Sequence, residues 1–233
     1  MVFDEVVRKV VALGAPVVCA DTCSILDVMR DPTRDDARVH NAIAALHMVA
    51  KMEANGELVC LLAEQVKLEL ADHLQPIQDE AKKRLSNLTD RVNRVNTIAA
   101  LFGPGATVDL AHFVGHEVRA RAMVDRWINV AEVVPQRPEI AGRAVARVIG
   151  PRAPARQGKD STKDCIVIET YFDMIRALRG AGLQSKIVFL SSNTTDYTNS
   201  QHGGLHDDLK PDFAALSIEY APNAGAARHA LGV

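Results

Sequence analysis

The sequence predicts an α/β fold with a central, mostly parallel sheet of four or five short strands. Short apolar runs alternate along the chain with longer segments of helical periodicity, which is typical of parallel sheets with helical crossovers. Hydrophobic residues make up 48% of the chain, enough for a full core. The 233 residues suit one α/β domain, or one domain with an insertion.

The first part of the chain predicts two helices and two strands. Apolar residues at helical spacing predict helices over 2–13 and 38–54. Residues 17–20 form a short, β-branched run that suits a buried parallel strand, and residues 58–63 form a second one.

A long, charged stretch without glycine follows over residues 64–100. Only Pro76 interrupts it, so the pattern predicts two helices that meet at this proline. Gly103-Pro104-Gly105 marks a break, and further helices are expected over 107–131 and about 138–149.

The last third of the chain predicts a loop, a helix and two more strands. Residues 150–160 are rich in Gly, Pro and Arg and indicate an exposed loop. An amphipathic helix is expected over 162–180, followed by strands over 186–190 and 216–220. We interpret residues 1–233 as a single domain with a helical insertion at about 76–157.

Composition excludes several classes of protein. No apolar run reaches the roughly 18 residues that a membrane span requires, and the N-terminal residues do not resemble a signal peptide. We therefore expect a cytoplasmic protein without a membrane partner. The net charge of −2 gives no global footprint for nucleic acid. The four cysteines form no C-x-x-C pair, which argues against a zinc knuckle, and we expect buried thiols.

Acidic residues lie beside the predicted strands. Asp21 follows the first strand, Glu64 and Glu69 follow the second, Asp164 precedes the third and Asp196 follows it. The carboxyl ends of parallel strands meet at one edge of a sheet. Carboxylates gathered there would repel each other unless a cation lay between them. Such a set suits Mg²⁺ or Mn²⁺, which can turn a water molecule into a nucleophile.

Each acid alone also has an ordinary structural explanation. Asp21 could cap a helix, Glu69 could be a solvated helix residue, and Asp164 could favour the positive end of its helix. Asp196 could form a turn. Asp160 could cap the following helix or contribute to the metal site. The ordered set, rather than any single residue, supports a metal site.

At these positions the chain resembles the PIN domain superfamily, and its larger members rather than the compact toxin type. The matching segments are VVCADTCSIL at 17–26, LLAEQVKLEL at 61–70, KDCIVIETY at 163–171 and FLSSNTTDY at 189–197. The resemblance implies a three-layer α/β/α fold. It also implies a Mg²⁺- or Mn²⁺-dependent nuclease, most often one that acts on RNA.

The resemblance suggests a role for individual residues. The catalytic and metal-binding acids correspond to Asp21, Glu69, Asp164 and Asp196. Glu69 fits better than Glu64 because residues 66–69 have the apolar-x-x-Glu form. The polar residue that holds the acids or a metal-bound water in this family matches Ser192 or Asn193.

A basic stretch leads into the predicted site. Between residues 137 and 163 the cations are Arg137, Arg143, Arg147, Arg152, Arg156, Lys159 and Lys163, against Glu139 and Asp160. Arg152, Arg156, Lys159 and Lys163 are candidates to bind a phosphate backbone, and an ordinary solvated surface explains them equally well. For a second basic group, at Lys82, Lys83, Arg84, Arg91 and Arg94, a charged exposed helix face is the preferred interpretation.

The sequence therefore predicts a metal-dependent endoribonuclease, with RNA as partner and DNA still open. The alternative is a catalytically inactive PIN-like module that binds RNA or protein. A phosphatase with an Asp nucleophile is disfavoured, because Cys23 stands where a second acid would be needed. A homodimer remains open, and an antitoxin partner is not expected.

Overall fold

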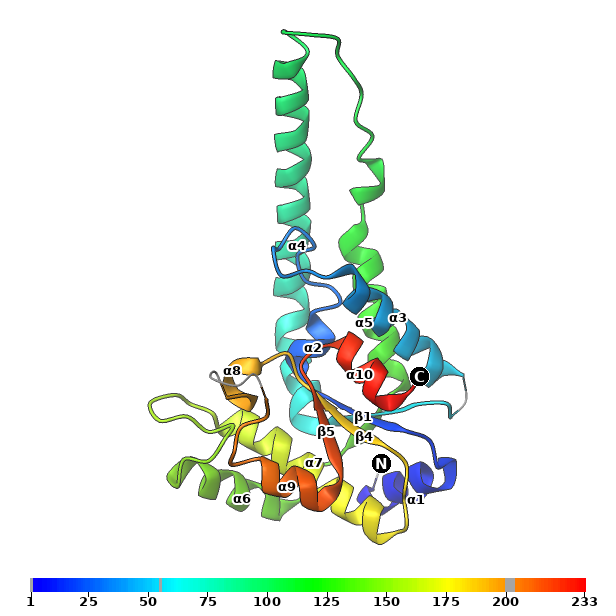
Figure 1. Cartoon of the computed structure of the whole chain (residues 1–233), viewed down its shortest axis with the longest axis vertical. Helices are drawn as coiled ribbons and strands as arrows, with labels where there is room; N and C mark the ends of the chain where they lie inside the picture. Colours follow the sequence, from blue (N-terminus) through cyan, green and yellow to red (C-terminus); the bar gives the residue numbers. More distant parts are fainter. Residues whose placement is uncertain (1, 55, 200–203) are drawn as a thin grey trace.

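A five-stranded parallel sheet forms the centre of the molecule (Figure 1). The structure is a computed structural model, and it describes residues 2–54, 56–199 and 204–233. The strand order is β3-β2-β1-β4-β5. The strands are β1 (Val17–Ala20), β2 (Val59–Ala63), β3 (Glu132–Val134), β4 (Ile187–Leu190) and β5 (Ile218–Ala221). The predicted α/β class and the number of strands are confirmed.

Helices cover both faces of the sheet, which confirms the three-layer arrangement (Figure 1). On one face lie α3 (Val39–Glu53), α5 (His116–Val130) and α10 (Ala224–Leu231). On the other lie α1 (Phe3–Leu13), α7 (Thr162–Gly180) and α9 (Lys210–Leu216), with α6 (Pro138–Ile149) packed on α7. Because both faces are covered, every residue of β1, β2 and β4 is buried.

Pro76 does not divide the long charged stretch into two helices, so that prediction is wrong. Helix α4 runs unbroken over Glu64–Ala99, 36 residues, with Pro76 inside it. Pro76 and Asp72 are both exposed. Water can therefore hydrate the Asp72 carbonyl that Pro76 cannot bond, and this lowers the cost of the proline. Buried side chains continue on both sides of it, at Leu70, Leu74, Ala81 and Leu85.

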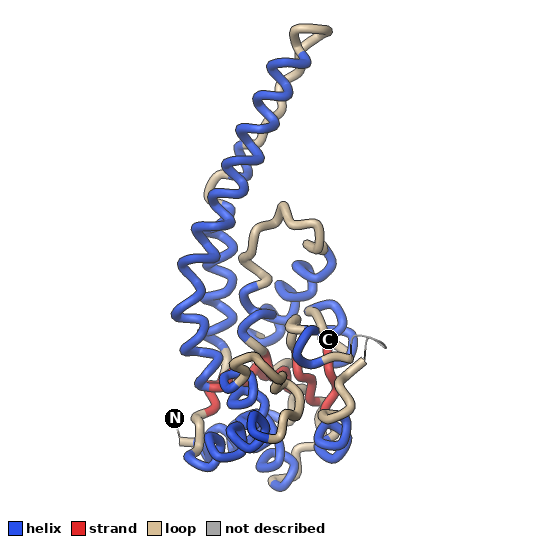
Figure 2. The backbone as a smooth tube through the Cα atoms, turned by 90° about the vertical axis from the view of Figure 1, so that its left-hand side faces the viewer, coloured by secondary structure: helices blue, strands red, loops and turns tan. Residues whose placement is uncertain are grey.

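The distal half of α4 projects from the body of the molecule as an arm (Figure 2). Leu85 is the last buried residue of this helix. The chain returns along the arm, where the Asn96 side-chain amide donates to the Ala106 carbonyl at 2.6 Å. Despite its length, neither α4 nor any other described helix combines the length and apolar character that a membrane span needs.

The returning segment contains much less helix than the predicted range of 107–131. Only a 3₁₀ turn at Ala111–Phe113 precedes α5, which begins at His116. Gly115, with φ of 70°, separates the two. Residues 103–109 are exposed, so no packing surface compensates for the cost of ordering a helix there.

Strand β3 and four short helices were not predicted. Glu132–Val134 has only three residues and begins with an acid, whose charge is paired with Lys9, so it carries no clear strand pattern. The last strand starts at Ile218 rather than 216, because Leu216 ends α9 and Ser217 adopts a left-handed φ of 52°. The unpredicted helices are α2 (Thr22–Leu26), α8 (Thr194–Tyr197), α9 and α10.

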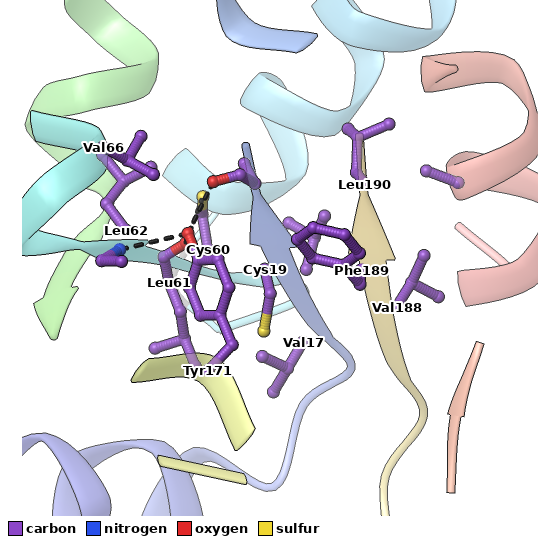
Figure 3. Packing of buried hydrophobic residues seen from close by; sticks show 14 of the residues in the cluster. Val17, Cys19, Cys60, Leu61, Leu62, Val66, Tyr171, Val188, Phe189 and Leu190 are labelled. Carbon is purple, nitrogen blue, oxygen red and sulfur yellow. Dashed lines mark hydrogen bonds between the residues drawn. The ribbon is translucent and has the colours of Figure 1, made fainter. Parts of the chain in front are cut away.

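A buried tyrosine ties the two central strands to α7 (Figure 3). The Tyr171 hydroxyl donates towards the carbonyls of Ala20, at 2.5 Å, and Leu61, at 3.2 Å, and it accepts from the Ala63 amide at 3.1 Å. Ala20 ends β1 and Ala63 ends β2. This hydroxyl therefore fixes the two strand ends from which the candidate site is built.

Tyr171→Phe should lower the free energy of unfolding by about 1–3 kcal/mol, because it leaves buried backbone groups without their partner. Tyr197→Phe is the matched control. Tyr197 is equally buried, but its hydroxyl has no hydrogen-bond partner in the described part of the chain. This control should be neutral or stabilising. Urea denaturation measures both variants, and equal losses would contradict the role given to Tyr171.

Candidate acidic site

Asp21 lies at the carboxyl end of β1, where the sheet changes direction. β1 pairs with β2 on one side and β4 on the other, so the chain leaves β1 and β4 towards opposite edges. Such switch points form crevices in parallel sheets. Asp21 caps α2: one carboxylate oxygen accepts from the Thr22 amide at 2.8 Å. The other accepts from the hydroxyl of Ser191 at 2.6 Å and the thiol of Cys23 at 3.2 Å.

Burial dominates the electrostatics of Asp21. It raises the pKa of this carboxyl above its ordinary value, although hydrogen bonds from Ser191, Cys23 and Thr22 act in the opposite direction. Burial also raises the pKa of Cys23 to about 12, so the Cys23 thiol keeps its proton and can donate it towards Asp21. Cys23 thus differs from the fully buried Cys19, Cys60 and Cys165.

Glu69 reaches the same site from α4. Its carboxylate accepts from the Thr22 hydroxyl at 2.6 Å and from the Gln65 side-chain amide at 3.1 Å. Glu64, the other candidate, is exposed and accepts from the Gln136 backbone amide at 3.1 Å. The structure therefore places Glu69, and not Glu64, beside Asp21.

Three predicted acids line one cleft of about 220 Å³. They are Asp21, Glu69 and Asp164. The rest of the wall consists of Thr22, Cys23, Leu26, Arg30, His73, Ile77 and Asn193. Residues far apart in the sequence thus meet at the end of β1, as the order of the acids predicted.

Asp164 shows how closely these charges approach each other. It lies in the first turn of α7. Burial, followed by the negative charges of Asp21 and Asp196, raises the pKa of Asp164 to about 7, while Lys159 acts against the shift. A carboxyl that keeps its proton near neutral pH is typical of a crowded acidic site.

Asp196 lies beside this cleft rather than in its wall. It belongs to α8, is buried, and faces a neighbouring hollow of about 380 Å³. It accepts from Lys159, with which it forms an ion pair, and from the Asn193 side chain at 2.8 Å. Burial alone would raise the pKa of Asp196, but these hydrogen bonds hold it below its ordinary value.

The predicted basic residues divide between the site and other contacts. Arg156 and Lys159 both lie against Asp196, with Arg156 at 3.5 Å from its carboxylate. Arg152 lies 3.7 Å from Asp212, away from the acids. Lys163 is exposed on α7.

The remaining predicted residues have structural contacts. Asp160 is exposed, and the hydrogen bond that it accepts from the Thr162 amide lowers its pKa, as in a helix cap. Ser192 donates its backbone amide to the Ser24 hydroxyl at 2.8 Å. Asn193 holds Asp196, as expected of the polar residue after the strand.

Sequence reasoning missed two hydroxyl residues that hold the acids, Ser191 and Thr22. Ser191, rather than Ser192, donates to Asp21. The register of the two parallel strands would have predicted this contact. Ala20 pairs with Leu190, so the next residues, Asp21 and Ser191, lie side by side. Thr22 follows Asp21 directly, and its hydroxyl points to Glu69.

The carboxylate oxygens of these acids are suitable ligands for a hard divalent cation, but their side chains are not arranged around a common point. Among the residues that the structure describes, no three His, Cys, Asp or Glu side chains are grouped so that they could hold a metal ion. Asp21 and Glu69 are engaged with hydroxyls, and Asp196 with Lys159. Nevertheless, carboxylate oxygens are the donors that Mg²⁺ and Mn²⁺ prefer, and the neighbouring carboxylates help to raise the pKa of Asp164.

The raised pKa of Asp164 predicts a pH-dependent stability in the absence of metal. Between its ordinary value of 3.8 and about 7, the folded state keeps a proton that the unfolded state has released. The free energy of unfolding therefore falls as pH rises through this window. Asp164→Asn should unfold like the wild type near pH 4 and be about 1–3 kcal/mol more stable at pH 8. Urea titrations in chelator test this, and parallel pH profiles for the two proteins would contradict it.

Comparison with known proteins identifies a family for this chain. Residues 18–197, more than half of the chain, match the PIN domain family, which has a nuclease-type fold. The matched segment includes Asp21, Glu69, Asp164 and Asp196. No curated protein and no solved structure matches the chain. The chain belongs to the PIN domain family.

Proposed function

We propose that this protein is a Mg²⁺- or Mn²⁺-dependent nuclease, and specifically an endoribonuclease. The observation that carries the proposal is the meeting of Asp21, Glu69 and Asp164 in one cleft of a PIN domain. Burial, followed by the charges of Asp21 and Asp196, raises the pKa of Asp164 to about 7. A bound divalent cation would offset the repulsion among these charges.

Asp21, Glu69 and Asp164 would hold the ion, with Asp196 beside them. When bound, the ion would supply an activated water as nucleophile and offset charge on the leaving oxygen. The hydroxyls of Ser191 and Thr22 orient the carboxylates of Asp21 and Glu69.

Positive side chains beside the acids support a phosphodiester substrate. Arg156 and Lys159 lie at Asp196, and Arg30 lines the cleft itself. Arginine and lysine supply most protein contacts to nucleic-acid phosphates. Lys159 would then exchange its ion pair with Asp196 for a substrate phosphate.

A catalytically inactive module that binds RNA or protein is the second candidate. The ion pair between Lys159 and Asp196 favours it, since a cation already neutralises one of the four predicted ligands. The two candidates differ in whether a divalent cation binds at the acids.

Cleavage assays with matched acid variants test the nuclease. A mixed RNA pool is incubated with Mn²⁺ or with chelator, and the cut ends are mapped. Asp21→Asn, Glu69→Gln and Asp164→Asn should each lower cleavage by about 100-fold or more, because each removes charge from the site. Glu64→Gln should cut at the wild-type rate, because Glu64 lies outside the cleft. An acid variant that cuts RNA as fast as the wild type would exclude that acid from the site.

Thermal unfolding with added Mn²⁺ separates the nuclease from the inactive module. At about 100 times its dissociation constant, an ion that binds only the folded state adds about 2.7 kcal/mol of stability. Wild type and Glu64→Gln should gain stability, and Asp164→Asn should gain little. No shift in the wild type would favour the binding module.

A further inference from the structure

The face of α4 that lines the acidic cleft continues outward along the arm. Glu69 and His73 line the cleft. At 3.6 residues per turn, positions about 18 residues apart on a helix complete five turns and point in the same direction. Asn87 therefore lies above Glu69, and Arg91 above His73, along one face of the continuous helix α4.

This continued face is basic. From residue 81 to residue 102 the chain has five cations, Lys82, Lys83, Arg84, Arg91 and Arg94, and one acid, Asp90. By helical geometry Lys83, Arg84, Arg91 and Arg94 share the cleft-lining side of α4, whereas Lys82 points to the opposite side. We call these four residues the basic stripe.

Three of the four residues of the basic stripe form no ion pair within the described chain, although Asp79 and Glu80 line one surface hollow together with Lys83 and Arg84. Arg84 lies 3.6 Å from Glu80 and 3.9 Å from Asp31. Lys83, Arg91 and Arg94 are exposed, and no acid of the described chain forms an ion pair with them. Unpaired, exposed cations on a rigid helix that starts in the cleft suit an extended polyanion.

We propose that the basic stripe binds the phosphate backbone of a double-stranded nucleic-acid stem that extends out of the acidic cleft. This rests on the proposed nuclease function and narrows its substrate to a structured one. From Glu69 to Arg94 the helix covers about 38 Å, at 1.5 Å per residue. Helix α4 contains no Phe, Tyr or Trp on which unpaired bases could stack. Single-strand grooves normally carry such aromatic side chains, so a straight row of cations fits a rigid duplex better.

The tip of the arm offers a competing explanation. Leu101 is 76% exposed and Phe102 is 88% exposed. Exposed apolar residues of this size can also mark a protein interface. They lie at the end of the arm, however, whereas the unpaired cations extend back along the helix towards the cleft, and this charge pattern favours the nucleic acid.

The test measures binding of the full chain by fluorescence anisotropy in chelator, so that no cleavage is needed. The probes are RNA hairpins with stems of about 20 and about 6 base pairs, of which only the longer is long enough to reach from the cleft to the end of the stripe. A DNA duplex of the longer sequence serves as a third probe. The variant Arg91→Gln/Arg94→Gln is compared with Lys82→Gln, which removes a charge from the opposite side of the same helix.

The double variant should bind the long RNA stem about 10-fold more weakly and lose about two units of the slope of log affinity against log salt. It should bind the short stem like the wild type, and Lys82→Gln should behave like the wild type throughout. If the double variant also binds the DNA duplex more weakly than the wild type does, the stripe binds the phosphate backbone of either kind of duplex. Unchanged affinity and salt slope in the double variant would overturn the proposal. If nucleic-acid binding is unchanged but the sedimentation coefficient of the double variant differs from that of the wild type, the stripe is a protein interface and the proposal is also overturned. If the wild type binds the long stem through the stripe but cuts no RNA with Mn²⁺, the proposed nuclease function is contradicted and the proposed stem binding is not.

Discussion

The candidate site depends on the parallel pairing of β1 with β2 on one side and β4 on the other. This pairing fixes the register in which Ala20 lies opposite Leu190, so the next residue on each strand, Asp21 and Ser191, must meet. The Tyr171 hydroxyl holds the ends of β1 and β2 at the same level by bonding to Ala20 and Ala63. A displacement of either strand by one residue would reverse the side chains at its end. The geometry of the acids is therefore a consequence of strand register, set by groups that take no part in chemistry themselves.

Carboxylates gathered at such an edge are costly, and the chain offsets the cost separately for each one. Asp21 is stabilised by the hydroxyl of Ser191 and the Thr22 amide, Glu69 by the Thr22 hydroxyl, and Asp196 by Lys159 and Asn193. In the described part of the chain Asp164 has only the more distant Lys159, at 4.0 Å, and its pKa rises to about 7.

The parts of the structure that depend on local pattern could be predicted from the sequence. The short apolar, β-branched runs at 17–20 and 58–63 and the amphipathic helix at 162–180 were predicted from local pattern, and the structure has β1, β2 and α7 there. The order of the acids along the chain predicted their meeting, because parallel strands place their carboxyl ends together. The sequence could not show that Pro76 stays within a helix, since that depends on the solvent exposure of Asp72. Nor could it reveal β3, whose three residues become a strand only because β2 offers a free edge. Nor could the sequence show that Lys159 forms an ion pair with Asp196, since charges pair according to proximity in space rather than in sequence; its contact with substrate stays a prediction.

Helix α4 connects the sheet, the acidic cleft and the arm. Its first turns are held by packing against the sheet and α7, and they carry Glu69 into the cleft. Beyond Leu85 no core supports it, and its helical state depends on continuity with the anchored part and on the returning chain, which bonds to Asn96. An isolated helix as short as residues 86–99 is marginal in water. A long, exposed, basic helix is therefore a cost to stability that the core does not require. The arm starts at the acids, and the face of α4 that lines the cleft continues along it. A role for the arm and the cleft in binding one extended ligand would explain this cost.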